Sequence, residues 1–459
     1  MPSMSTTSSE RAARRLAPVA LLAGVLGVAL LTCCGPDGGE LDGGAPDGGV
    51  ARDAGRDGSH DASRPRDAGR DAGPPPPPVW LPLEGLPEGC ELSLAADPEA
   101  VAGPLRFEEC PDMAGCRQLV VDWTTEQAPR LNIVTGSHDG EHGYFAYARG
   151  AEPGWRWVVV ARDDGHVLAV VRSRIEGTTD GFQCYAFNVA PTSEHAGFVV
   201  ATSRPGVIGD SIIGLIEWGS GTPTFRVLAT LTTAFLGPNN FPQQIEIGDD
   251  FIAAQVVPRY DVVRVGFDGS VRFVTGAEPG GPVLEAGGRD GLFYLTLRPA
   301  SGLWTATADD EVGRVLWDPP DADIGGIETD GVDLVWAQMY DKVREYEYGR
   351  VELWTSPYTT DPAALAPRRV AEVPIGFLAA TLHAGSGHAL VAAAGVLTVY
   401  ALDTGRIGLL RPPPDTEWRG HYVAFFGPEE LAVMPSRLRS FVPESSTLRI
   451  IRYDALLAE

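Results

Sequence analysis

The chain has 459 residues, of which 44% are hydrophobic, and its formal net charge is −25. The excess of acidic residues excludes a nucleic-acid binder that works through bulk charge, because such a protein needs a basic face against the phosphates. The hydrophobic content excludes a chain that is disordered throughout, since it is ample for a core.

The N-terminus has the pattern of an export signal. Arg11, Arg14 and Arg15 precede an uncharged run of 16 residues over positions 16–31. A basic stretch followed by an apolar run of this length is typical of a secretory signal peptide. The run is short for a membrane-spanning helix, which needs about 20 apolar residues. The sequence therefore predicts a signal peptide over residues 1–33.

The end of this run resembles the lipobox of bacterial lipoproteins. In Leu31-Thr32-Cys33-Cys34 a leucine stands three residues before Cys34, and the resemblance implies cleavage before Cys34 and lipidation of that cysteine. Cys33 departs from the family, which has Gly, Ala or Ser there, so an ordinary secreted protein is the alternative. Two or more acyl chains anchor a protein stably. The lipobox thus implies an exported protein held on a membrane of the cell envelope, and Gly35 in place of an inner-membrane retention Asp favours the outer membrane.

Residues 35–78 change abruptly to Gly, Asp, Ala and Pro. Leu41 and Val50 are the only apolar side chains of this segment larger than Ala or Pro, so the segment cannot offset the entropy lost on ordering. About 44 flexible residues span roughly 35 to 40 Å. We predict a disordered tether over residues 34–78. Residues 1–34 carry +2 and residues 35–78 carry −4, which leaves −23 for a folded domain over residues 79–459.

A turn residue followed by four or five mostly apolar residues recurs seven times in the folded domain. The steps between these turns run from 32 to 56 residues with a mean of about 44, close to the ~40–50 residues of a four-stranded propeller blade. The turn residues are Gly165, Gly197, Asp250, Gly291, Gly331, Gly387 and Pro428.

Several of these units continue with a strand, a turn and a second strand. Asp268-Gly269 is a turn that favours tight strand reversal. The predicted strand pairs are 214–218 with 224–228, 262–267 with 271–274, 303–307 with 314–317, 351–354 with 368–373, and 397–402 with 406–410.

These patterns predict an all-β protein, a β-propeller with seven blades, with six or eight blades as alternatives. We expect the terminal strand 447–453 to share a blade with N-terminal strands such as 119–123. The chain resembles TolB-like and WD40-like bacterial β-propellers over residues 130–459, through its repeat length and phrases such as Leu353-Trp354-Thr355 followed by Arg368-Arg369. The resemblance implies a fold and no particular activity. A pair of β-sandwiches is the alternative architecture.

The folded domain contains four cysteines: Cys90, Cys110, Cys116 and Cys184. An even number in an exported protein predicts two disulfides, for which three connectivities exist. Turn-forming residues between Cys110 and Cys116 favour a bond between those two, which leaves Cys90 with Cys184. The bonds would pin the N-terminal segment onto the ring. Free buried thiols are the alternative, and the irregular spacing argues against zinc.

Three short clusters could carry chemistry, but none has the context that its chemistry needs. Residues 137–142, Ser-His-Asp-Gly-Glu-His, are predicted to form a glycine-containing turn. The four-residue spacing of His138 and His142 would place both on one face of a helix, but in a turn it does not indicate a metal site. Asp318, Asp321 and Asp323 could gather around Ca²⁺, although turns are commonly rich in Asp. Residues 209–211, Gly-Asp-Ser, resemble an esterase motif without its α/β setting.

We therefore predict no catalytic residue, no resident metal and no cofactor, and we favour a non-catalytic protein. The predicted function is that of a lipid-anchored envelope propeller that binds a protein or a glycan partner and no nucleic acid. The alternative is an envelope enzyme, a hydrolase or glycan lyase, with its site at the propeller channel. That enzyme would need a His, Tyr or carboxylate group at one end of the channel.

Overall fold

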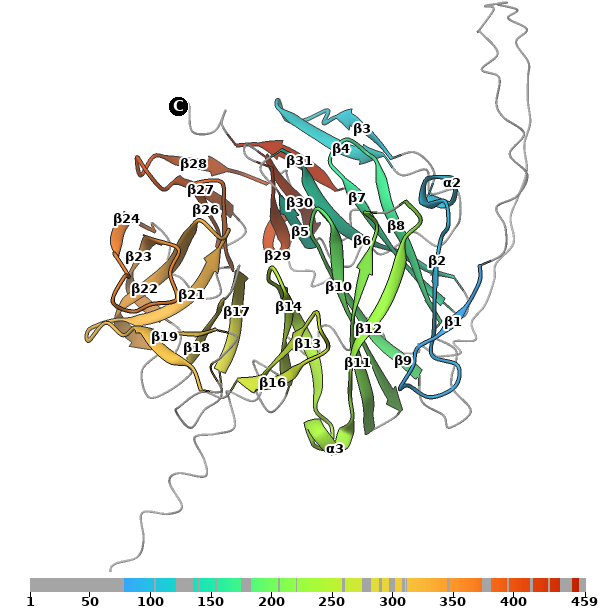
Figure 1. The fold of residues 1–459 in the computed structure, drawn as a ribbon. Coiled ribbons are helices and arrows are strands. Elements are labelled where there is room, and N and C mark those ends of the chain that lie inside the picture. The colour runs from blue at the N-terminus through green and yellow to red at the C-terminus, as the bar shows by residue number, and fades with distance from the viewer. Residues whose placement is uncertain are drawn as a thin grey trace, which may run out of the picture. The chain divides into compact units, whose positions relative to one another are not determined.

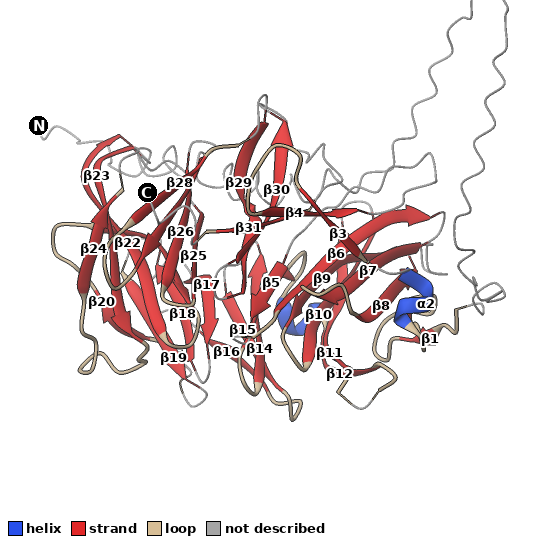
Figure 2. Ribbon diagram, turned by 90° about the horizontal axis from the view of Figure 1, so that it is seen from above, coloured by secondary structure: helices blue, strands red, loops and turns tan. Residues whose placement is uncertain are grey.

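Antiparallel strands make up most of the described chain, and its only helices are two short ones (Figure 2). The helices are α2 (Pro98–Ala102) and α3 (Thr233–Leu236). The structure is a computed structural model that describes residues 78–453. The positions left out are 103–104, 121–134, 139–140, 153–154, 175–182, 205–206, 220, 258–260, 275–281, 289–290, 297–301, 308–309, 311, 345–346, 374–380, 394–395, 413–415, 428–429 and 438–447.

The described strands form seven antiparallel sheets (Figure 1). The first sheet has the order β1-β2-β8-β7-β6-β5 and the last has the order β29-β30-β31-β4-β3. The first sheet contains β1 (Leu81–Pro82), β2 (Glu91–Leu94), β5 (Thr135–His138), β6 (Gly143–Glu152), β7 (Trp155–Arg162) and β8 (Val167–Arg174). The last contains β3 (Arg106–Glu109), β4 (Cys116–Val120), β29 (Thr416–Gly427), β30 (Glu430–Arg437) and β31 (Arg449–Arg452).

The five sheets between them have four strands each, and each is a simple meander in chain order. The second sheet contains β9 (Gln183–Pro191), β10 (His195–Arg204), β11 (Val207–Glu217) and β12 (Thr224–Leu231). The third contains β13 (Phe241–Ile247), β14 (Phe251–Val257), β15 (Asp261–Gly266) and β16 (Val271–Val274). The fourth contains β17 (Pro282–Gly288), β18 (Gly291–Thr296), β19 (Leu303–Thr307) and β20 (Arg314–Trp317). The fifth contains β21 (Asp323–Thr329), β22 (Asp333–Arg344), β23 (Glu347–Pro357) and β24 (Arg368–Glu372). The sixth contains β25 (Thr381–Gly385), β26 (His388–Ala393), β27 (Val396–Ala401) and β28 (Ile407–Leu410).

The sheets follow one another around a closed ring. One strand of each sheet, here called innermost, contacts the innermost strands of both neighbouring sheets: these strands are β5, β9, β13, β17, β21, β25 and β29. Contact between β29 and β5 joins the last sheet to the first. The chain is therefore an all-β propeller, as the repeat predicts, and not a pair of sandwiches.

Each pair of neighbouring sheets shares its own buried apolar cluster. Phe198 of the second sheet lies in one cluster with Val160 of the first, and Trp336 of the fifth sheet lies in another with Phe293 of the fourth. The remaining pairs are filled in the same way. Dividing 381 residues among several small cores suits a domain of this length, because single cores stop growing at about 250–300 residues.

The position of a strand within its sheet explains its sequence pattern. The central strand β14, sequence FIAAQVV, is buried at six consecutive positions because sheets cover both of its faces. The outer strand β28, sequence IGLL, alternates between exposed and buried residues, as expected with solvent on one side. Gly269 has a φ of +86° in the turn between β15 and β16, a conformation that glycine adopts without steric cost.

The N-terminal segment supplies strands to both the first and the last sheet. Strand β2 pairs with β8 at the outer edge of the first sheet, whereas β4 pairs with β31 and completes the last sheet. The expected sharing of a sheet by the terminal strand and the 119–123 region is thus observed, with Ile450 opposite Arg117. Both favoured disulfides are present: Cys90–Cys184 links this segment to β9, and Cys110–Cys116 closes the loop between β3 and β4.

All five predicted strand pairs are hairpins of the structure. One of the seven repeat landmarks is misplaced. Six of them lie at or next to the start of the second strand of a sheet, but Gly165 precedes β8, the fourth strand from the innermost edge of the first sheet. The equivalent position is Gly143, at the start of β6. Strand β8 resembles an inner strand in sequence because β2 covers its outer edge and leaves it buried.

Among the described residues, no helix is long and apolar enough to cross a membrane. The signal peptide, Cys34 and nearly the whole of the tether lie outside the described residues.

Candidate functional site

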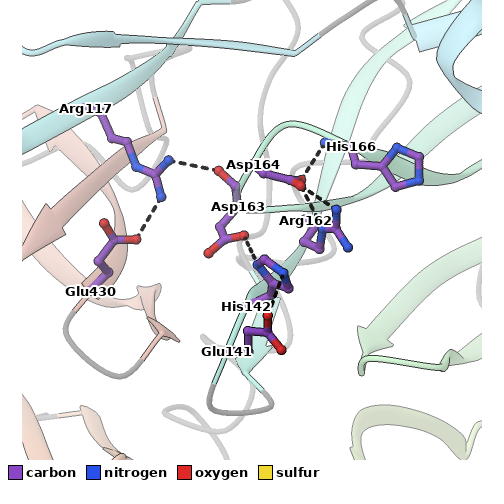
Figure 3. Close-up of polar contacts among 8 residues, drawn as sticks. All are labelled: Arg117, Glu141, His142, Arg162, Asp163, Asp164, His166 and Glu430. Carbon is purple, nitrogen blue, oxygen red and sulfur yellow. Dashed lines mark hydrogen bonds and ion pairs between the residues drawn. The ribbon is translucent and has the colours of Figure 1, made fainter.

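The largest group of paired charges that includes a predicted cluster residue lies where the first and last sheets meet (Figure 3). We call it the seam network and define it as Glu99, Arg117, Glu141, His142, Arg162, Asp163, Asp164, His166 and Glu430. It draws on β4 and β30 of the last sheet, on the β5–β6 connection and the β7–β8 turn of the first sheet, and on α2.

Arg117 joins the two sheets across the seam. Its Nη1 donates to the backbone oxygen of Asp163 at 3.0 Å, and its Nη2 donates to Glu430 Oε2 at 2.8 Å. The guanidinium also lies over the ring of Phe107, 5.1 Å from the ring centroid. A residue of the N-terminal strand β4 thus holds both a C-terminal strand and the first sheet, which makes Arg117 part of the ring closure.

His142 is the member of the predicted 137–142 cluster that enters this network. Its Nδ1 lies 3.1 Å from Asp163 Oδ1, and its Nε2 lies 3.9 Å from Glu141 Oε1. Figure 3 shows the carboxylate of Asp163 directed to His142 while the backbone of the same residue faces Arg117. The imidazole therefore makes its shorter contact with the neighbouring turn and its longer one with Glu141 of its own loop.

The turn between β7 and β8 is held by its own charges. Arg162 Nε donates to Asp164 Oδ2 at 3.0 Å, and the backbone N–H of His166 donates to Asp164 Oδ1 at 3.0 Å. The hydrogen bond from Arg162 lowers the pKa of Asp164 to about 2. His166 Nδ1 also lies 2.5 Å from Glu99 Oε1 on α2, which ties the N-terminal segment to this turn.

These shifts favour a structural role for the network over an acid–base role. A general acid or base works best with a pKa near the operating pH, but the pKa of Asp164 moves away from neutrality and the pKa of Arg162 is raised by its bond to the same carboxylate. The described residues contain no group of three or more His, Cys, Asp or Glu placed to hold a metal. The seam network can therefore close the ring and present charged groups at its surface.

The other sequence clusters are dispersed in the structure. Asp323 accepts a hydrogen bond from Tyr348 Oη at 2.7 Å, and its carboxylate pairs with Lys342 at 3.5 Å. Asp210 caps a backbone N–H at Thr233, 2.7 Å away, whereas Ser211 is wholly buried in β11. A buried strand serine cannot act as an exposed nucleophile. Residues 209–211 therefore resemble the esterase motif in sequence but not in structure. The side chain of His138 and residues 139–140 lie outside the described parts.

Among the innermost-strand residues whose side chains the structure describes, three ionisable ones were not expected from the sequence. Glu246, Glu328 and His383 are half-buried, and they pair in register with Ala253, Val335 and Leu390 of the adjacent strands. Glu246 and Glu328 are next to last in β13 and β21, close to the carboxyl ends of those strands, whereas His383 is the central residue of β25. Because successive four-stranded meanders bring the chain back in the same direction, these ends share one side of the ring. Sequence alone offers no signal for them, since their positions follow from the register.

No family model matches the sequence, and no curated protein matches it. Similar solved structures include a prolyl endopeptidase, with 13% identity, a TM-score of 0.44, and coverage of 77% of this chain and 54% of its own. The β-propeller domain of the Trilobed protease from Pyrococcus furiosus has 8% identity, a TM-score of 0.39, and coverage of 66% of this chain and 91% of its own. A putative TolB from Agrobacterium tumefaciens has 12% identity, a TM-score of 0.31, and coverage of 54% and 82%. The chain thus spans about half the length of the prolyl endopeptidase that it matches. The propeller fold of this chain is defined by the sheets and pairings described above.

Proposed function

We propose that this protein is a lipid-anchored β-propeller of the bacterial envelope that binds a protein or glycan partner without catalysing a reaction. In this proposal, lipid on Cys34 holds the mature chain on a membrane, the outer membrane being favoured. The tether of residues 34–78 lets the propeller search a volume around that anchor, because a flexible chain of this length spans roughly 35 to 40 Å.

The observation that carries this proposal is the fastening of the segment directly after the tether. Residues 81–120 supply strands to two sheets, and both disulfides lie in this segment or join it to the ring. Arg117 adds polar contacts to Glu430 and Asp163. Tension applied between the anchor and a bound partner would therefore act on covalent bonds and on strands paired on the ring. Such fastening suits a tethered binding domain.

The experiment that tests this proposal is cross-linking in intact cells followed by capture of the full-length protein. We expect a reproducible partner whose yield saturates as the expression of the protein rises. A Cys34→Ala variant serves as the control, since it contains the same propeller without the anchoring cysteine, and we expect its yield of envelope partner to fall. Capture of no saturable partner by the wild-type protein would contradict a binding function.

An envelope enzyme is the second candidate, and the innermost strands favour it. Glu246 and Glu328 supply carboxylates near one side of the ring, and His383 supplies an imidazole at the middle of an innermost strand; these are the types of group that a hydrolase or glycan lyase uses. Incubation of the protein with envelope polymers tests this candidate. Release of fragments that disappears in Glu246→Gln, Glu328→Gln or His383→Gln variants would support it, and intact polymers would leave the binding function in place.

We also assign one blade to each sheet, which gives seven blades. Seven buried clusters, one between each pair of neighbouring sheets, support this count. Six or eight blades are the alternatives, and a density map of the purified protein viewed along the ring axis distinguishes them.

A further inference from the structure

The fifth sheet carries an organised polar face that the seam network and the innermost strands do not include. Trp336, Gln338 and Tyr340 follow one another on one face of β22, and Trp354, Glu352 and Arg350 lie directly opposite them on β23. The burial of β22 changes along this row: Trp336 and Gln338 are buried, Tyr340 is half-buried, and Lys342 is exposed. The face therefore leads from an apolar core to solvent within a few residues.

A buried carboxylate organises this face. The side chain of Glu352 is only 6% exposed, and its Oε1 lies 2.9 Å from both Arg350 Nη1 and Arg369 Nε. Its second oxygen, Oε2, accepts a hydrogen bond from Trp354 Nε1 at 3.2 Å. The two guanidiniums are therefore held side by side by one anion that solvent scarcely reaches, which fixes their orientation before any ligand arrives.

The aromatic residues next to the arginines are positioned in a similar way. With its amide oriented to satisfy both indoles, Gln338 accepts from Trp317 Nε1 at 2.8 Å and from Trp336 Nε1 at 3.0 Å, and its nitrogen donates to Tyr340 Oη at 2.7 Å. Arg350 lies over the ring of Tyr340, 4.2 Å from the ring centroid. The rings and cations at the solvent side of this face thus form one connected arrangement.

Carboxylates engage the two arginines of this face only in part. Arg350 and Arg369 remain 42% and 47% exposed, and they share the single charge of Glu352. Glu372 pairs with Arg369 Nη2 at 3.5 Å but is itself 58% exposed, so solvent weakens this contact. Each guanidinium has five N–H donors, and the contacts to Glu352 and Glu372 use only some of them. Arg350 and Arg369 balance Glu352 and Glu372 in formal charge, so this face is locally neutral on a domain of formal charge −23.

We propose that this face of the fifth sheet binds an anionic glycan, with Arg350 and Arg369 as the anion-recognising residues. The inference rests on the proposed binding function and names the class of its partner. A planar guanidinium matches a carboxylate or a phosphate with two parallel hydrogen bonds, so the recognised group is an acidic substituent of a sugar. Half-buried Tyr340 lies under Arg350, and half-buried Trp354 shares the carboxylate of Glu352 with both arginines; these rings add aromatic surface against which the apolar face of a sugar ring packs.

The test uses the full mature protein and isothermal titration calorimetry with three probes. Polygalacturonate carries carboxylates, a phosphomannan carries phosphates, and dextran is neutral. We expect binding of at least one anionic polymer and no binding of dextran, and the polymer that binds identifies the acidic group. Lysine substitutions Arg350→Lys and Arg369→Lys retain the positive charge near Glu352 but lose the planar fork. Each should weaken binding at least about tenfold, the effect of losing one charged hydrogen bond.

Two further variants make the result specific to this face. Arg314 is 48% exposed and pairs with Asp310 at 3.0 Å on the neighbouring sheet, so Arg314→Lys is a matched control and should change affinity less than about twofold. Glu372→Gln removes a carboxylate that competes for Arg369, so it should tighten binding. Circular dichroism of each variant verifies that the fold is retained.

The inference is overturned if neither anionic polymer binds, if dextran binds equally well, or if Arg314→Lys weakens binding as much as Arg350→Lys. It is also overturned, while the proposed function stands, if cross-linking captures an envelope partner whose yield is unchanged in Arg350→Lys and Arg369→Lys. Absence of any captured partner counts against the proposed function itself, so the two failures are distinguishable.

Discussion

Removal of the Cys90–Cys184 disulfide should destabilise the protein far more than removal of Cys110–Cys116. The first bond joins residues 94 apart in the sequence and the second joins residues 6 apart. A cross-link stabilises a protein mainly by restricting the unfolded chain, and the effect grows with the length of the closed loop. By that relation the long loop contributes about 4.7 kcal/mol at 25 °C and the short loop about 2 kcal/mol.

Paired alanine substitutions test this difference. Cys90 and Cys184 are 1% and 5% exposed, so alanine is preferred to serine, which would bury a hydroxyl without an assigned partner. Urea unfolding followed by tryptophan fluorescence gives the free energy of unfolding of each variant and of the reduced wild-type protein. We expect Cys90→Ala/Cys184→Ala to lose about 4 to 5 kcal/mol and Cys110→Ala/Cys116→Ala to lose about 2 kcal/mol.

The order of the two stability losses tests the argument from chain entropy. A loss of about 4 to 5 kcal/mol is a large part of the 5–15 kcal/mol typical of folded proteins, so the first variant should be marginal at 37 °C. Equal losses, or a larger loss for the short loop, would refute the argument from chain entropy. The second result would instead show that the geometry of the β3–β4 loop at the ring closure dominates.

Three further substitutions test local parts of the structure. Arg117→Met should lower the free energy of unfolding by about 1–2 kcal/mol, because it removes two partly exposed charged hydrogen bonds at the seam, and urea unfolding measures it. The pKa of Asp164 falls from 3.8 to about 2 on folding, so its contribution is present above pH 4 and is lost as pH falls toward 2. Its side chain is 43% exposed, which limits this contribution to about 1 kcal/mol, and Asp164→Asn should remove that pH dependence. Gly165→Ala should cost more than Gly387→Ala in thermal unfolding. Both glycines have positive φ, but a Cβ on Gly165 would lie 2.6 Å from the backbone oxygen of Leu105, whereas nothing lies within 4 Å of one on Gly387.

Control measurements show whether these effects are specific to Arg117 and Asp164. Arg106 is exposed on β3, the strand beside Arg117, so Arg106→Met should leave stability nearly unchanged. An equal loss in the two arginine variants would mean that the seam contacts contribute nothing specific. An Asp164→Asn variant that keeps the acid dependence of the wild-type protein would assign that dependence to other carboxylates.

The repeat, the hairpins and the disulfide pairing could be predicted because each has a local or countable signal. Asp268-Gly269 marks its hairpin by turn chemistry, and the spacing of Cys110 and Cys116 marks a local loop. The misplaced landmark at Gly165 has a physical cause as well. Strand β8 is buried at six of its eight positions because β2 pairs beyond it, and burial gives an outer strand the sequence of an inner one.

The candidate sites could not be predicted because they depend on long-range pairing. Arg117 contacts residues 46 and 313 positions away, and only closure of the ring brings those segments together. Arg369 reaches Glu352 because a register shift between Leu353 and Trp354 places it opposite Trp354. The partners of His142 also depend on tertiary structure, since its shorter contact is with Asp163 in the turn of the next hairpin and its longer one is with Glu141 of its own loop.

The central claim is that this propeller is held on the envelope through lipid at Cys34, and the most direct test is the N-terminus of the mature protein. Labelling of cells with palmitate, followed by mass spectrometry of the purified chain, measures that terminus and its modification. The account predicts a chain that begins at an acylated Cys34 and a Cys34→Ala variant without label. An unmodified N-terminus at another residue, with no incorporated palmitate, would contradict it.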